Sequence, residues 1–259
     1  MKNDFFAETA LLGQGLADCS NEKILEAWQK ALPLNLEALV WLWQGEITVG
    51  TLPQFLQVRN APDMGRFNMY NLPSAMADGK SGFLTAGGAM RAAADLGKKA
   101  VVSCGIGGIT AAEVSSDFPA LCSLPVWLLA TAVKDMFDPA FVLEYLHKHK
   151  IRAFGFEQSA ADGYMFIGNA VPLDGCLRCG GDLPQDVRLL LNPIPQAKRI
   201  TDRRILAKAL AAGEKAKAAG GIYHPAVNRA LAEMTDGKTS EIQLLAFLKN
   251  IEIACRWKF

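Results

Sequence analysis

The middle of the chain carries a series of short, continuous apolar runs, which is the pattern that buried parallel strands produce. The segment FDPAFVLEYLHKHK, which separates the second run from the third, has the pattern of a helix. Strand, helix and strand at this spacing predict parallel pairing with helical crossovers. The four runs are AVVSC (Ala100 to Cys104), PVWLLAT (Pro125 to Thr131), IRAFGFE (Ile151 to Glu157) and VRLLLN (Val187 to Asn192).

Helical patterns flank these predicted strands. Ser20 is a typical N-cap for a helix through about Leu32, in which Ile24, Leu25 and Trp28 share one face. The helix predicted at 85–96 is rich in Gly and Ala, which lets another backbone come close. Further helices are predicted at 73–79, 202–219, 225–235 and 240–257, and two strands around a turn at Gln44-Gly45 are predicted in 38–50.

Together these elements predict an α/β fold. We expect a three-layer α/β/α architecture with a largely parallel or mixed central sheet and a helical C-terminal third. No internal repeat, low-complexity tract or linker interrupts residues 1–259, so we predict a single domain.

Composition and charge narrow the class of protein. Hydrophobic residues make up 51% of the chain and charged residues 20%, as in ordinary globular proteins. The formal net charge of +1 gives no broad electrostatic case for binding a nucleic acid polymer or a membrane surface. No apolar run is long enough to span a bilayer, and the N-terminus lacks a signal-peptide core. We therefore expect a cytoplasmic protein that binds a small molecule.

Cysteine usage adds one motif. Of the six cysteines, Cys176 and Cys179 form a single CxxC. One such pair is half a zinc site, and no second CxxC or paired histidine completes it. A role in zinc binding or redox chemistry and a surface hairpin with two reduced thiols are the alternatives.

In open parallel sheets, ligands bind beyond the carboxyl ends of the strands. Gly105 to Gly108 leave the first apolar run, and their backbone N–H groups can face an anion, although a tight turn without a ligand is the alternative. Asn192 stands where two prolines end the fourth run rigidly. Glu157, at the end of the third run, is most simply a solvated strand end.

Lys134 follows the second apolar run directly. A lysine at the mouth of a buried strand is partly desolvated, which lowers the pKa of its ammonium and makes the amine nucleophilic. A lysine at a helix start, paired with Asp135 or Asp138, is the alternative interpretation.

Glu8 lies between Phe5-Phe6-Ala7 and Ala10-Leu11-Leu12. A carboxylate in an apolar run needs a partner or a shifted pKa, and this is the environment of a general acid. An outward-pointing glutamate on an edge strand is the alternative.

Several of these segments occur together, and in the same order, in one known family. The chain resembles the pseudouridine-5′-phosphate glycosidase family, also called indigoidine-synthase-A-like, from about Ala7 to Lys249, and the match from Asp117 to Lys134 needs no gap. The matching segments are Glu8 to Gly15, Gly105 to Gly108, Glu113 to Asp117, Leu129 to Asp138, Leu143 to Leu146 and Leu191 to Pro195.

The resemblance implies a covalent mechanism. In that family a lysine, here Lys134, attacks C1′ of a ribosyl group, and a glutamate, here Glu8, donates a proton as the C–C glycosidic bond breaks. It also implies Mn²⁺ at Glu113 and a homo-oligomer, specifically a trimer. The substrate contacts that it implies are Arg66, Thr85, Ala86, Gly107, Gly108, Ser115, Ser116, Asp117, Asn192 and Gln243.

The chain also departs from the family pattern around the substrate. Arg66 replaces a substrate-binding lysine, Glu113 replaces a metal-binding aspartate, and Gln243 replaces an asparagine. Gln14 stands where the family has a histidine, and the loop after Gly108 lacks the His-Arg pair that holds the 5′-phosphate.

We therefore expect a C-glycoside lyase or synthase that joins a pentose, carrying a phosphate, to a base-like aglycone through a lysine–sugar adduct. Authentic cleavage of pseudouridine 5′-phosphate to uracil and ribose 5-phosphate is one alternative. A non-catalytic binding protein that keeps the fold is the other.

Overall fold

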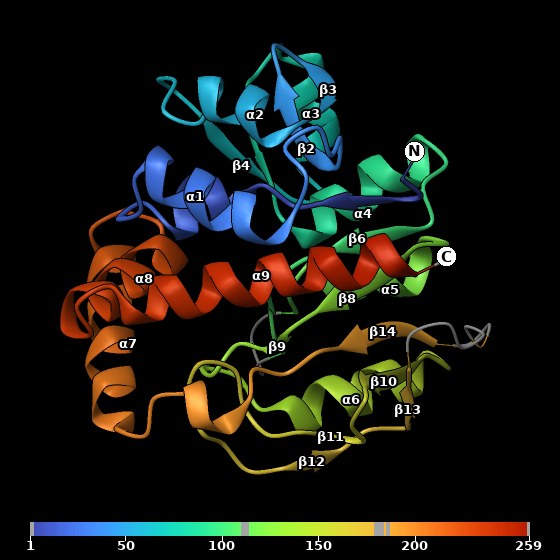
Figure 1. Ribbon diagram of the computed structural model, residues 1–259, viewed down its shortest axis with the longest axis vertical. Helices are drawn as coiled ribbons and strands as arrows, with labels where there is room; N and C mark the ends of the chain where they lie inside the picture. The colour runs from blue at the N-terminus through green and yellow to red at the C-terminus, as the bar shows by residue number, and fades with distance from the viewer. Residues whose placement is uncertain (1–2, 110–113, 179–183, 185–186, 258–259) are drawn as a thin grey trace.

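One mixed β-sheet runs through the molecule, and helices cover both of its faces (Figure 1). The computed structural model describes residues 3–109, 114–178, 184 and 187–257. Across the sheet, the strands are β13 (Gly175–Leu177), β10 (Arg152–Phe156), β14 (Val187–Leu191), β8 (Trp127–Ala130), β6 (Ala100–Val102), β1 (Phe5–Ala7), β2 (Leu39–Trp43), β5 (Gly82–Leu84) and β4 (Gly65–Phe67), with β3 (Glu46–Gly50) paired to β2.

The four predicted parallel strands are confirmed. β6, β8, β14 and β10 lie side by side in that order, all parallel, and β1 and β2 continue the parallel set. The hairpin β2–β3 and the pair β2–β5 are antiparallel, so the sheet is mixed. β1 has β2 on one side and β6 on the other. The edge-strand interpretation of Glu8, which directly follows β1, is therefore wrong.

Side chains alternate across β1 and join two separate cores. Phe5 and Ala7 pack in the core with α1 (Asn21–Ala31) and α9 (Lys238–Arg256). Phe6 points to the other face and packs with α4 (Ala86–Asp95), α5 (Asp117–Ser123) and α6 (Pro139–Lys148). This alternation is the period of two of a β-strand, and it produces the predicted three layers.

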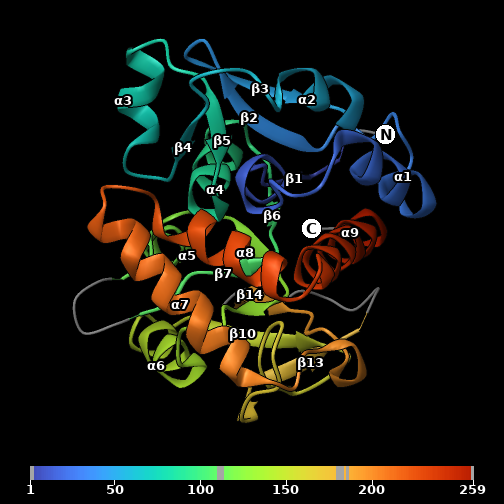
Figure 2. The same cartoon turned by 90° about the vertical axis from the view of Figure 1, so that its left-hand side faces the viewer.

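Two more helices close one end of the molecule. α7 (Arg203–Ala218) and α8 (Tyr223–Met234) pack against each other, and this end faces the viewer in Figure 2. α8 also packs on η1 (Leu11–Gly15), a π-helix that begins shortly after Glu8. The remaining short elements are α2 (Leu52–Val58), α3 (Leu72–Ala77), the 3-10 helix η2 (Gln196–Lys198) and the antiparallel pair β11 (Ala160–Ala161) and β12 (Val171–Pro172). Within the described residues, no helix is both long and apolar enough to cross a bilayer.

Local signals in the sequence explain most element ends. The hydroxyl of Ser20 accepts a hydrogen bond from the Lys23 N–H, as an N-cap does. The predicted turn forms at Gln44 and Gly45, which adopt φ of 51° and 84°. We did not predict α2, although Thr51 and Gln54 form a capping box that marks its start.

A small second sheet lies beyond the carboxyl ends of two central strands. β7 (Gly105–Ile106) follows β6, β9 (Ala132–Val133) follows β8, and the two pair in parallel. Gly105 and Lys134 therefore lie beyond the carboxyl ends of the strands of the main sheet, at the same end where Glu8 follows β1.

Candidate active site

Glu8 directly follows the central strand β1 and is only 6% exposed. Its Oε1 atom accepts a hydrogen bond of 2.8 Å from Ser103 Oγ. Burial raises the pKa of the Glu8 carboxyl above its usual value, and the nearby Arg66 cation opposes this shift. A carboxyl that stays protonated at higher pH is suited to act as a general acid.

Lys134 directly follows β9, and its backbone N–H donates to the carbonyl of Ile106. Burial lowers the pKa of its ammonium, and the positive charge of Arg66 lowers it further. A Cβ atom on Gly105 would lie 2.9 Å from Lys134 Cγ and 2.7 Å from the Tyr164 ring. A residue without a side chain is therefore required at 105 for the lysine stem to pass.

The alternative pairing of Lys134 with a following aspartate does not occur. The Asp135 carboxylate accepts the backbone N–H groups of Tyr164 and Met165, both at 2.9 Å, and Asp138 caps α6 at Ala140. Among the described residues, no hydrogen bond or ion pair involves the Lys134 side chain.

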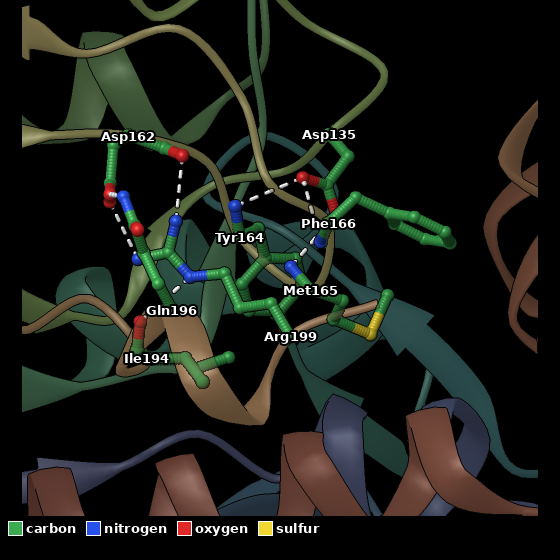
Figure 3. A network of polar contacts seen from close by, with 8 residues as sticks. All are labelled: Asp135, Asp162, Tyr164, Met165, Phe166, Ile194, Gln196 and Arg199. Atoms are coloured by element: carbon green, nitrogen blue, oxygen red, sulfur yellow. Dashed lines mark hydrogen bonds and ion pairs between the residues drawn. The ribbon is translucent and has the colours of Figure 1, made fainter. Parts of the chain in front are cut away.

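Asp135 anchors the site to the segment that carries Tyr164 (Figure 3). In the same view, Arg199 donates to the carboxylate of Asp162 and to the carbonyl of Ile194. The side chain of Arg199 is 2% exposed, so the guanidinium of this ion pair is buried. The two clusters hold the segment after Lys134 and the loop after β14 in one arrangement.

Asp117, the first residue of α5, joins two other parts of the site. Its Oδ1 accepts the N–H of Gly87 and its Oδ2 accepts the N–H of Gly107, both at 2.9 Å. We predicted that the N–H groups of the glycine loop face a ligand anion. At Gly107 the N–H instead donates to the carboxylate of Asp117, which belongs to the chain itself. A Cβ on Gly87 would approach the Ser116 carbonyl oxygen to 3.1 Å, which confirms that small residues in α4 allow close backbone contact.

These elements enclose a cavity of about 230 Å³. It brings the two predicted catalytic residues together with most of the predicted substrate contacts. Its lining consists of Glu8, Arg66, Asn68, Thr85, Ala86, Gly105, Gly107, Gly108, Ser115, Ser116, Asp117, Lys134, Phe137 and His224.

A smaller chamber of about 30 Å³, which we call the inner chamber, lies against the same side chains. It has room for one water-sized group. Gln243 of α9 faces this chamber and not the main cavity, and it accepts a hydrogen bond from the Tyr164 hydroxyl. Within the described part of the chain, its buried Nε2 atom has no hydrogen-bond partner.

Besides Gln243, two predicted site residues are not placed in the main cavity. Asn192 donates from Nδ2 to Asn250 Oδ1 and lines a separate groove between α1, α9 and the loop after β14. Glu113 lies outside the described residues, and so does Cys179, whereas Cys176 is exposed and reduced.

Sequence reasoning missed three residues of the cavity lining, Asn68, Phe137 and His224. His224 is one of only three histidines in the chain, which was the available signal. It stands in the first turn of α8, and nothing local in the sequence connects that turn with Lys134.

A metal site cannot be assembled from the described residues alone. They contain no group of three or more His, Cys, Asp or Glu side chains that could hold a metal ion. They therefore do not form a Mn²⁺ site by themselves.

Known proteins resemble the chain over most of its length. The chain is 23% identical to a pseudouridine-5′-phosphate glycosidase of Methylobacterium nodulans, in an alignment that covers 96% of this chain and 80% of the relative. It is 26% identical to one of Alkaliphilus metalliredigens, over 83% of this chain and 77% of the relative.

Two solved structures share the fold. An indigoidine synthase A-like protein from Thermotoga maritima MSB8 superposes with a TM-score of 0.74 at 19% identity, over 98% of this chain and 92% of that one. The prealnumycin C-glycosynthase AlnA, in complex with ribulose 5-phosphate, superposes with a TM-score of 0.73 at 19% identity, over 98% and 89%.

Fold and site define an α/β protein whose central strands end at a half-buried lysine and a buried glutamate. The model of the family described as indigoidine synthase A like protein matches residues 8–173. The chain belongs to that family.

Proposed function

We propose that the chain breaks or forms a C–C glycosidic bond between a pentose, carrying a phosphate, and a base-like aglycone, through a covalent adduct on Lys134. The observation that carries this proposal is the meeting of Lys134 and Glu8 in one cavity, where burial shifts the pKa of each group toward its neutral form. A neutral amine is a nucleophile and a neutral carboxyl is a proton donor, so the two roles are complementary.

The cleavage direction proceeds in balanced steps. The Lys134 amine forms a bond to the sugar C1, and the bond from C1 to the ring oxygen breaks, which opens the ring. The ring oxygen gains a proton and the substituted nitrogen loses one, so the nitrogen lone pair is free again. The C–C bond then breaks, the nitrogen lone pair becomes the second bond of an iminium, and Glu8 gives its proton to the departing carbon. Water hydrolyses the iminium and releases the sugar. The aglycone carbon must sit beside a carbonyl group, because its electron pair needs a place to go as the bond breaks.

A sugar phosphate suits the charge of the cavity. Among the described lining residues, the cationic side chains are Lys134 and Arg66. Among the described residues, the guanidinium of Arg66 makes one long hydrogen bond, of 3.4 Å to the Ala10 carbonyl, which leaves its other planar donors available for a phosphate. The fold shared with a C-glycosynthase that binds ribulose 5-phosphate supports this class of substrate.

Cleavage of pseudouridine 5′-phosphate is the second candidate, favoured by the activity for which the curated relatives are named. Release of uracil from pseudouridine 5′-phosphate, followed by ultraviolet absorbance, distinguishes it. Uracil release that is lost in Lys134→Ala would establish this activity. Turnover of another C-glycoside, with pseudouridine 5′-phosphate inert, would establish the broader proposal. No turnover of any C-glycoside in either direction would contradict both.

The proposal extends to three further properties. Two of them, a Mn²⁺ ion that involves Glu113 and assembly as a trimer, come from the resemblance, and the third, a cytoplasmic location, comes from the absence of a membrane span and a signal-peptide core in the sequence. Sedimentation equilibrium of the purified chain measures the assembly, and a monomer would contradict the trimer.

A further inference from the structure

We propose that His224 is a further catalytic group of this site, whose imidazole takes a proton from the Lys134 ammonium and passes it to the sugar ring oxygen as the ring opens. This inference rests on the proposed function, because the transfer has a purpose only if Lys134 attacks a sugar carbon.

Position is the first support. His224 lines both the main cavity and the inner chamber. Only a few side chains do so among the described residues, and they include Glu8, Arg66 and Lys134. The helix α8 therefore brings an imidazole to the boundary where the nucleophile and the acid meet, although it is far from both in the sequence.

The second support is a ring nitrogen of His224 that has no hydrogen-bond partner among the described residues. This atom, Nδ1, is buried. A buried polar atom without a partner is costly, and at a functional site it indicates a partner that arrives with the substrate or with a proton. The imidazole also contacts the ring of Tyr223, at 5.4 Å between centroids, in the first turn of α8.

The other groups that face Lys134 are poor acceptors for its proton. Both oxygens of Asp117 already accept backbone N–H groups. Glu8 accepts from Ser103 and must keep its own proton for the aglycone. Burial raises the pKa of Cys104 to about 11, so its thiol holds its proton, and Arg66 is a cation. The imidazole is the neutral base that remains among the described neighbours.

The electrostatics agree with this role. The positive charge of Lys134 lowers the pKa of His224 to about 3, with burial and Arg66 acting in the same direction. The imidazole is therefore neutral while the lysine is charged, and it can take up a proton only as that proton leaves the lysine.

The proposed transfer balances in atoms and charge. A proton leaves Nζ and an imidazolium forms. The freed lone pair makes the bond to C1 as the bond from C1 to the ring oxygen breaks, and the imidazolium gives its proton to that oxygen. The positive charge ends on the substituted nitrogen, and His224 is neutral again.

The test compares His224→Gln with wild type, and His149→Gln is the matched control because His149 is exposed directly after α6. The readout is the rate at which ribose 5-phosphate becomes trapped on Lys134 by borohydride, measured from neutral to alkaline pH. We expect His224→Gln to react on the order of 10²-fold more slowly than wild type at pH of about 7. Its rate should recover as pH rises through the pKa of Lys134, where no base is needed. Added imidazole should partly restore His224→Ala. A His224→Gln rate equal to wild type at every pH would overturn the inference.

A second measurement needs no substrate. Titration of the His224 ring, followed by NMR, should show a strongly depressed pKa in wild type and a clearly higher pKa in Lys134→Met, which burial and Arg66 still hold below the ordinary value of about 6.5. The same titration in both proteins would overturn the inference even where trapping succeeds. Coupled titration without any trapped sugar in wild type would instead overturn the proposed function, and with it the catalytic role of His224.

Discussion

Ser103 Oγ donates a hydrogen bond of 2.8 Å to Glu8 Oε1, and so connects the ends of the adjacent strands β6 and β1. This bond favours the ionised carboxylate, whereas burial favours the protonated form more strongly, so the pKa of Glu8 is raised on balance. The pKa of the acid is therefore set by burial, which raises it, and by the Arg66 cation and the Ser103 hydroxyl, which lower it.

Removing that hydroxyl should raise the pKa of Glu8 further. The acid works only when protonated, so activity falls as pH rises through its pKa. In Ser103→Ala this alkaline limb should move upward by roughly one pH unit or more, since a hydrogen bond to a charged group contributes about 1.5–3 kcal/mol. The pH profile of kcat measures the change, with Ser123→Ala, whose hydroxyl is exposed, as the control. A limb that stays in place or moves down would show that Ser103 does not set the pKa.

Ionisation of the buried Glu8 should also lower the free energy of unfolding at neutral pH. Its folded-state pKa lies above the unfolded value, so its contribution to stability is present in acid and is lost as pH rises through the folded pKa. Glu8→Gln lacks this loss. Its free energy of unfolding, relative to wild type, should therefore increase from pH 5 to pH 8, by about 1.4 kcal/mol for each pH unit by which the folded-state pKa exceeds 5. Denaturant titrations at the two pH values measure this, and Glu37→Gln, at an exposed site, should show no such change.

Asp117 holds the Gly107 loop to the start of α4 through two backbone N–H groups. Asp117→Asn would turn an NH₂ group toward one of these donors. We expect a loss of about 2–4 kcal/mol in the free energy of unfolding, together with reduced activity, because a buried donor loses its partner. The exposed control Asp95→Asn breaks only a surface ion pair with Arg91 and should stay within about 0.5 kcal/mol of wild type. Equal stability of the two variants would contradict the role given to Asp117.

The family resemblance predicts a metal requirement that involves Glu113. Chelation should lower activity, and added Mn²⁺ should restore it. Glu113→Gln should weaken Mn²⁺ binding by roughly tenfold or more, because a carboxylate ligand is replaced by a neutral amide. Electron paramagnetic resonance of free Mn²⁺ measures the affinity directly. Activity that survives complete chelation, with no bound Mn²⁺, would remove the metal from the account.

The strands could be predicted from the sequence because a buried parallel strand needs an unbroken apolar run, as in AVVSC and PVWLLAT. Helix starts at Ser20 and Thr85 were predictable because the capping hydroxyl acts within three residues. The position of Lys134 past a strand end followed from the same pattern.

The rest of the site depends on contacts between distant segments. Arg66 arrives from β4 and His224 from α8, and no local periodicity connects either with Lys134. The loop at Gly107 had the glycines of an anion site, but its N–H donates to Asp117, ten residues further along. Asn192 follows a central strand as predicted, yet Asn250 holds its side chain away from the cavity.

The covalent role of Lys134 is tested most directly by trapping. Wild-type protein incubated with ribose 5-phosphate and borohydride should gain the mass of one reduced sugar phosphate, and peptide mass spectrometry should locate it on Lys134. Lys134→Arg, which keeps the charge but holds its proton, should gain none. An adduct on another lysine, or no adduct with any pentose or hexose phosphate, would contradict the account.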